Sequence, residues 1–263
     1  MDQSGSQPDQ MPRLTFSANL GFLWKESTLP EAIRLAKAAG FSAVECHTPY
    51  DVPAAEVKAA LDETGLPMLG INTVRGMPGD SGLAALAGRE GDARAAILQA
   101  IRYAEAIGAG AIHVMAGRAE GAAAHAAFLD NLAYAREACP AGITLLIEPL
   151  NPHDAPGYFL NSTDQARGII EDLALPGVKL MFDCYHVGRT EGDIVTRLRD
   201  LLPVIGHIQF ASVPDRGPPD RGEVDYRYVF RASEALGWER PLGAEYRPAG
   251  ETGASLGWMR DLA

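Results

Sequence analysis

The sequence has few positive charges for its length. It contains 23 lysine and arginine residues against 34 aspartate and glutamate residues, and its formal net charge at pH 7 is −11. An acidic surface of this kind repels the phosphate backbone of nucleic acids, which basic patches bind. We therefore expect a protein that does not bind DNA or RNA.

Long hydrophobic runs are missing as well. No stretch approaches the roughly 20 apolar residues that a membrane-spanning helix needs. The first dozen residues, MDQSGSQPDQMP, lack the basic start and apolar core of a signal peptide. The sequence therefore predicts no membrane partner, and it predicts that residues 1–12 form a disordered polar tail.

Cysteine is scarce, with three residues at Cys46, Cys139 and Cys184. The odd number argues against a disulfide framework, and the spacing matches no zinc-binding pattern. We therefore expect a reduced protein of the cytoplasm.

What the sequence does contain is an eightfold alternation of short apolar segments with amphipathic helical patterns. One such pattern, ARAAILQAIRYAEAIGAG, places apolar residues at positions i, i+3 and i+4. Eight repeats in about 250 residues are typical of the (β/α)8 TIM barrel, which we predict as one α/β domain over residues 13–263. The predicted strands are 14–19, 43–47, 67–72, 111–115, 144–148, 178–183, 205–210 and 242–246.

The main alternative fold is a doubly wound open sheet. That fold would place a glycine-rich turn after the first strand, whereas the segment NLGFLWKES has only Gly21. Residues 73–90 are too long and too rich in glycine for a plain turn between a strand and a helix. They are either a lid over the catalytic face or a surface insertion without a role.

Acidic or amide residues end the last four predicted strands, one on each strand. They are Glu148, Asp183, Gln209 and Glu245. Because side chains alternate along a strand, all four can point into the barrel at the carboxyl ends of the strands, where barrel active sites lie. Buried carboxyl groups are costly unless a charge offsets them, and four oxygen donors suit Mg²⁺ or Mn²⁺ better than zinc. A single residue of this kind often only caps a helix, so the prediction depends on all four.

The alternation also assigns neighbours to these residues. Leu146 shares a strand face with Glu148, and Gly243 shares a face with Glu245 and leaves room beside it. The alternation is therefore consistent with candidates that point toward the barrel axis from the last turns of their strands.

Further candidates for substrate binding follow the strand ends. His186, in the segment DCYH, could orient or protonate a substrate oxygen, and His113 could line the pocket. Arg216 could grip a substrate carboxylate, because a guanidinium matches that group with two hydrogen bonds. The alternatives are a loop histidine bonded to the backbone, a core histidine and an exposed loop arginine. Three residues near strand ends stay ambiguous at this stage: Glu45, His47 and Asn72.

Several segments together resemble the hydroxypyruvate isomerase family of xylose-isomerase-like TIM barrels and its relatives, the 2-oxo-tetronate isomerases. They are IEPLNPHDAPGYFLN, MFDCYH, GHIQFASVP, GEVDY and EYRPAG, and the similarity runs from about residue 13 to residue 258. The resemblance implies that the four strand-end residues hold a divalent metal, that Glu148 and Glu245 also transfer protons, and that His186 contacts substrate.

The resemblance implies a metal-dependent isomerase of the aldose–ketose type. Its substrate would be a small hydroxy-oxo acid such as hydroxypyruvate, which gives tartronate semialdehyde, or a 2-oxo-tetronate. One departure bears on the substrate: the family usually has Arg-His-Glu-Pro where this chain has residues 216–219, Arg-Gly-Pro-Pro. This loop borders the substrate, so its exact identity stays open.

Other functions remain as alternatives. A keto-sugar 3-epimerase uses the same barrel but usually has a histidine where Gln209 stands. A dehydratase of cyclitol ketones, a more distantly related enzyme, is a further alternative. An endonuclease-IV-like repair enzyme needs three metals and more than the six histidines present. A non-catalytic sugar-acid binder would not need the Glu148–Glu245 pair. The sequence leaves a homo-oligomer open and locates no contact surface for it.

Overall fold

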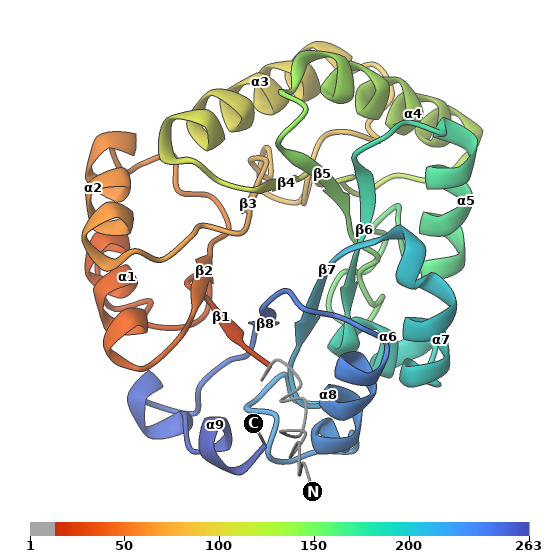
Figure 1. Ribbon diagram of the computed structural model, residues 1–263. Coiled ribbons are helices and arrows are strands. Elements are labelled where there is room, and N and C mark those ends of the chain that lie inside the picture. Colours follow the sequence, from red (N-terminus) through yellow and green to blue (C-terminus); the bar gives the residue numbers. More distant parts are fainter. Residues whose placement is uncertain (1–13, 263) are drawn as a thin grey trace, which may run out of the picture.

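The computed structural model describes residues 14–262, and the predicted tail, residues 1–12, lies outside the described residues. Eight parallel strands form a barrel with helices around it (Figure 1). Neighbouring strands follow the order β2-β1-β8-β7-β6-β5-β4-β3. The strands are β1 Phe16–Asn19, β2 Ala43–Glu45, β3 Ile71–Asn72, β4 Ala111–His113, β5 Thr144–Ile147, β6 Val178–Asp183, β7 Ile205–Phe210 and β8 Leu242–Ala244.

The gap between β2 and β3 is bridged by backbone hydrogen bonds. Val44 pairs with Met68 in a parallel bridge. The Leu69 amide donates to the Val44 carbonyl at 2.7 Å, and the Asn72 amide donates to the His47 carbonyl at 2.7 Å. The predicted TIM barrel is therefore confirmed, and the open doubly wound sheet is not what the chain forms.

Helices follow the strands and form the outer ring (Figure 1). Side-chain hydrogen bonds cap the N-termini of two of these helices. The Thr28 amide donates to the Glu31 side chain at 2.9 Å before α1 (Leu29–Ala38), and the Ser162 side chain accepts from the Gln165 amide at 3.2 Å before α5 (Thr163–Leu173). Within residues 14–262, no helix has both the length and the apolar character needed to cross a membrane. The helices are α1 Leu29–Ala38, α2 Ala54–Thr64, α3 Glu90–Ile107, α4 Gly121–Ala138, α5 Thr163–Leu173, α6 Cys184–Thr190, α7 Ile194–Leu201, α8 Tyr226–Ala235 and α9 Trp258–Asp261.

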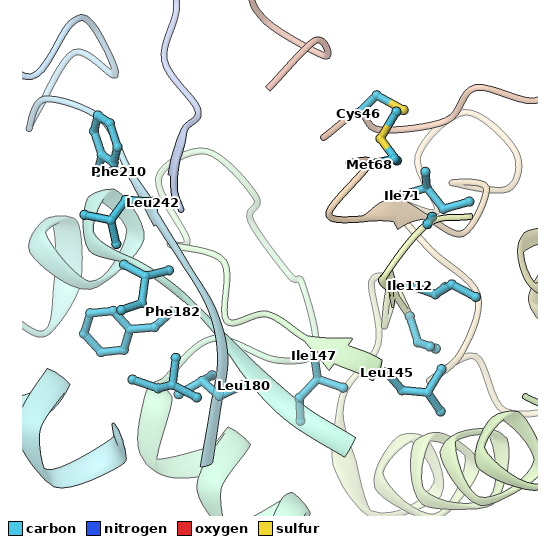
Figure 2. Packing of buried hydrophobic residues seen from close by; sticks show 14 of the residues in the cluster. Cys46, Met68, Ile71, Ile112, Leu145, Ile147, Leu180, Phe182, Phe210 and Leu242 are labelled. Carbon is cyan, nitrogen blue, oxygen red and sulfur yellow. The ribbon is translucent and has the colours of Figure 1, made fainter. Parts of the chain in front are cut away.

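The strands have two different faces. Their outward side chains pack under the helices in the main core, and Figure 2 shows several of the packed residues, among them Ile112, Leu145 and Phe182. The inward side chains of Ala111, Leu146 and Met181 form a small apolar cluster of their own. Because Leu146 and Met181 stand two residues before Glu148 and Asp183, this cluster floors the polar end of the barrel.

The long segment between β3 and α3 is fastened to the chain that follows β4. Gly82 forms an antiparallel bridge with Ala116, and the Ala85 amide donates to the Ala116 carbonyl at 2.7 Å. Exposure is concentrated in residues 75–79, with Met77 67% exposed. Most of the segment is therefore fixed, including the backbone of Arg75, whose carbonyl accepts from the Gly82 amide at 2.8 Å, and any lid movement would be limited to residues 76–79.

Candidate active site

A cavity of about 480 Å³ opens at the carboxyl ends of the strands. Its walls come from loops after most of the strands, so the barrel closure brings together residues that are far apart in the sequence. Five of the seven predicted site residues line the cavity: Glu148, Glu245, His113, His186 and Arg216. The other two, Asp183 and Gln209, are not part of its lining. All seven are buried.

Glu148 and Asp183 present carboxylate oxygens that lack hydrogen-bond partners among the described residues. The Oε1 atom of Glu148 and the Oδ2 atom of Asp183 are both buried in this way. The second oxygen of Asp183, Oδ1, accepts from the Tyr185 amide at 2.9 Å and caps α6. Asp183 therefore serves as a helix cap with one oxygen and faces the site with the other.

Gln209 is oriented by a buried network under the site. Its Nε2 atom donates to Glu45 at 3.2 Å, and His207 lies 2.7 Å from the same Glu45 oxygen. A carboxylate can only accept hydrogen bonds, so the amide of Gln209 must turn its NH₂ group to Glu45 and its oxygen away. That oxygen is buried and has no partner in the described part of the chain.

Gly243 makes room for this network. A Cβ atom at this position would lie 2.8 Å from Cγ of Gln209 and 2.9 Å from Nε2 of His207, and closer still to Glu45. Any larger residue would displace the side chains that orient the amide. The absence of a side chain here is therefore part of the construction of the site.

Glu245 differs from the other two acids because both of its oxygens have partners. Oε1 accepts from Nδ2 of Asn19 at 3.0 Å and lies 3.0 Å from Nε2 of His47. Oε2 accepts from Arg216 at 2.6 Å. Its carboxylate is therefore held by groups on the β1, β2 and β7 sides of the cavity.

Arg216 bridges two of the acids. Its Nη2 atom lies 2.6 Å from Glu245 and 3.6 Å from Oδ2 of Asp183, and its guanidinium carbon lies 4.8 Å from the ring centres of both Phe22 and Tyr185. Its backbone has φ = +56°, a left-handed conformation that non-glycine residues rarely adopt. The loop after β7 therefore accepts backbone strain to place this side chain.

His186 has a defined tautomer. Its Nδ1 atom accepts from the Asn151 amide at 2.9 Å, so the proton of the neutral ring is on Nε2, which lies 3.7 Å from Glu148 and 3.6 Å from Asp183. Burial, followed by the charge of Arg216, lowers the pKa of His186 to about 3. The ring is therefore a neutral donor aimed at the acids.

Burial and neighbouring charges shift the pKa values of Glu148, Asp183 and Glu245 in different directions. Burial raises the pKa of Asp183 to about 7, and burial, together with the charges of Glu245 and Asp183, raises the pKa of Glu148 well above its usual range. At Glu245 burial acts in the same direction, but the charge of Arg216 and the hydrogen bond with His47 outweigh it and lower the pKa. Neighbouring carboxyl groups with divergent pKa values are typical of active sites.

The donor set fits a divalent cation. Within the described residues, one group of His, Cys, Asp and Glu side chains is compact enough for a metal: Glu148, Asp183 and His186, whose ligand atoms lie within 4.8 Å of one another. The tautomer of His186 places a proton on the nitrogen that faces this group, so the oxygens are the better donors. A cation would supply the missing partner of the buried oxygens and would offset the repulsion between the acids.

Several residues of the cavity were missed at the level of sequence. Asn19 holds Glu245 together with His47, which the sequence had left ambiguous, and four further cationic side chains line the walls: Lys25, Arg75, Arg118 and Arg247. Each of the four follows a predicted strand within a few residues, which is the signal that could have indicated them.

A barrel of eight parallel strands with a cavity of acids, histidines and arginines at its carboxyl mouth defines a TIM-barrel enzyme. The chain matches the family model described as xylose isomerase-like TIM barrel over residues 33–262. It belongs to the family of hydroxypyruvate isomerases and 2-oxo-tetronate isomerases within this class and is an isomerase.

Three comparisons support this assignment. The 2-oxo-tetronate isomerase of Cupriavidus necator is 44% identical over 257 residues, which cover 95% of this chain and 98% of that protein. The hydroxypyruvate isomerase of Escherichia coli is 35% identical over 257 residues, 94% of this chain and 98% of that protein. A crystal structure described as AP endonuclease, family 2, from Brucella melitensis has a TM-score of 0.91 at 36% identity and covers 95% of this chain and 99% of that one.

Proposed function

We propose that this protein interconverts a 2-oxo-3-hydroxy acid and its aldehyde isomer by proton transfer through an enediolate. The favoured substrates are hydroxypyruvate, which gives tartronate semialdehyde, and a 2-oxo-tetronate analogue. The observation that carries the proposal is the buried group of Glu148, Asp183 and Glu245 beneath a cavity with cationic walls. The names of the similar isomerases agree with it.

The chemistry assigned to the chain is a proton shuttle between two carbons. One carboxylate of the Glu148–Glu245 pair removes the proton from C3 of hydroxypyruvate, and the electrons move toward the C2 oxygen. Return of a proton at C2 and transfer of the O3 hydroxyl proton to the C2 oxygen complete the 1,2 shift without any net gain or loss of atoms. The Nε2–H group of His186 would donate a hydrogen bond to a substrate oxygen as negative charge develops there.

A divalent cation, Mg²⁺ or Mn²⁺, is part of this proposal. Glu148, Asp183, Gln209 and Glu245 would hold it, and Glu245 would join by exchanging its contact with Arg216. When bound, the cation would supply Lewis-acid stabilisation of the charge on the substrate oxygens.

The direct test is incubation with hydroxypyruvate in D₂O, followed by NMR. We expect deuterium at C3 that depends on the protein, together with formation of tartronate semialdehyde. The same assay across 2-oxo-tetronates and keto-hexoses determines the chain length. Exchange at C3 of keto-hexoses alone would favour the 3-epimerase alternative, and no exchange with any substrate would contradict catalysis.

The buried network gives a second prediction, on cation affinity. Replacing Glu45 by glutamine removes the negative charge and leaves one acceptor oxygen instead of two, which weakens the hold on the amide of Gln209 and on the direction of its oxygen. Loss of such a supporting partner costs about 10- to 100-fold in metal affinity, so Glu45→Gln should weaken Mn²⁺ binding by that factor in calorimetry. The control Glu137→Gln, at an exposed position of α4, should bind Mn²⁺ as the wild type does. Equal affinities in a folded Glu45→Gln variant would contradict the role given to Gln209.

The cysteines support the proposal of a reducing, cytoplasmic location. Cys46, Cys139 and Cys184 are all free thiols and buried, and burial raises the pKa of Cys46 to about 12. Thiols protected in this way need no pairing and are poor nucleophiles.

A further inference from the structure

Charge is divided within the cavity. Glu148 and Glu245 lie at its floor and are buried, while Lys25, Arg75, Arg118 and Arg247 are exposed on its walls together with one acid, Asp154. Across residues 14–262, no ion pair involves any of these four side chains. In a chain with a net charge of −11, a cluster of unpaired cations around one cavity favours an anionic ligand.

Arg216, the predicted carboxylate-binding residue, is already engaged by protein groups. Its guanidinium contacts Glu245 and Asp183 and lies between the rings of Phe22 and Tyr185. It is 8% exposed. Its charge therefore stabilises the acids, and a substrate carboxylate needs other partners.

Arg75 and Arg118 stand on one rigid wall of the cavity. The Gly82 amide donates to the Arg75 carbonyl at 2.8 Å, and the Arg118 amide donates to the Asp80 carbonyl at 2.8 Å. The Asp80 carboxylate is bound to Arg89 at 2.7 Å, so it does not neutralise either arginine.

Two glycines allow this wall to form. Gly82 has φ = +128° and Gly117 has φ = +96°, and a Cβ atom on Gly82 would lie 2.6 Å from the Met115 carbonyl oxygen. The chains after β3 and β4 can approach this closely only without side chains at these positions. The two arginines therefore start from a fixed backbone, which lowers the entropy cost of binding an anion.

We propose that Arg75 and Arg118 bind the carboxylate of the substrate and thereby select 2-oxo acids over neutral keto-sugars. This inference rests on the proposed function, because it assumes that the acid floor carries out isomerisation. Two guanidinium groups on one wall can hold a carboxylate through paired hydrogen bonds. Lys25 and Arg247 lie on the loops after β1 and β8, and Arg247 lies 5.7 Å from the ring centre of Phe22.

The kinetic test compares hydroxypyruvate with dihydroxyacetone, its neutral counterpart in which a hydroxymethyl group replaces the carboxylate. Arg75→Gln and Arg118→Gln should each lower kcat/KM for hydroxypyruvate by about 10- to 100-fold, the range for a lost hydrogen bond to a charged group. The rate with dihydroxyacetone should stay within about threefold of wild type, since it lacks the charge. The control Lys37→Gln removes the same charge from an exposed position of α1 that does not line the cavity, and it should shift the ratio of the two substrates by less than about threefold at physiological salt.

A binding test separates this inference from the isomerase proposal. Calorimetry with D-glycerate and glycerol, which differ only in the carboxylate, requires no turnover. Preference for D-glycerate that is lost in Arg75→Gln and Arg118→Gln supports the subsite even if hydroxypyruvate is not isomerised. The assignment is overturned if hydroxypyruvate is turned over and both arginine variants still prefer D-glycerate to glycerol. It is also overturned if this preference is lost in Lys25→Gln instead. Either result leaves the isomerase proposal in place.

Discussion

Replacement of Glu148 by glutamine is expected to lower kcat by about 10²- to 10⁴-fold, the usual contribution of general acid–base catalysis. Glutamine has nearly the same shape but can neither take up nor release the proton. Glu148 is buried, and its Oε1 atom has no hydrogen-bond partner in the described chain, so the exchange keeps the volume and removes only the ionisable group. The measurement is steady-state turnover together with deuterium exchange at C3.

Glu245→Gln should show a similar loss of turnover and adds a distinction. Glu245 is held by Arg216, His47 and Asn19, whereas an amide can accept from these donors with one oxygen only. The metal content of the Glu245→Gln variant should fall less than its activity, because three other oxygen donors remain. Glu137→Gln serves as the matched control and should keep its rate. A near wild-type rate in either active-site variant with metal bound would remove the pair from catalysis.

Much of the barrel could be predicted because each strand carries its own signal. Residues 178–183 and 205–210 were predicted as strands with the bounds that the structure has. The third strand is shorter than predicted: only Ile71–Asn72 is regular, although Met68 still pairs with Val44. Pro67 lacks an amide hydrogen and cannot extend a regular ladder.

The contacts of the site were less predictable because they join residues far apart in the sequence. Asn19 and Glu245 are separated by 226 positions and meet only when the barrel closes. The burial of Arg216 between Phe22 and Tyr185 likewise depends on the loop after β1, the first turn of α6 and the loop after β7. Alternation along a strand indicates which face a residue takes, but it does not indicate which side chains from other strands will meet it.

Removal of divalent cations with EDTA is expected to abolish activity, with a loss of at least about 10³-fold, because a Lewis acid contributes several kcal/mol to such reactions. Buried oxygens of Glu148, Asp183 and Gln209 would then lack a partner in the described chain, and the acids would repel one another across the floor. Arg216 offsets the charges of Glu245 and Asp183, but it makes no ion pair with Glu148 in the described part of the chain. Mg²⁺ or Mn²⁺ added back should restore turnover.

A structural measurement must accompany this activity test, since a chelator could also act by unfolding. A cation that binds the folded chain and not the unfolded chain raises the melting temperature with its concentration. We therefore expect the chelated protein to stay folded, with a lower melting temperature that recovers when Mn²⁺ is added. Asp183→Asn should reduce this recovery, because the loss of the negative charge weakens the cation site. The amide oxygen of the asparagine can still accept from the Tyr185 amide and cap α6, so the fold should be kept. Activity that survives exhaustive chelation would contradict the role of the cation, and it would assign the stabilisation of the enediolate to Arg216 and His186 alone.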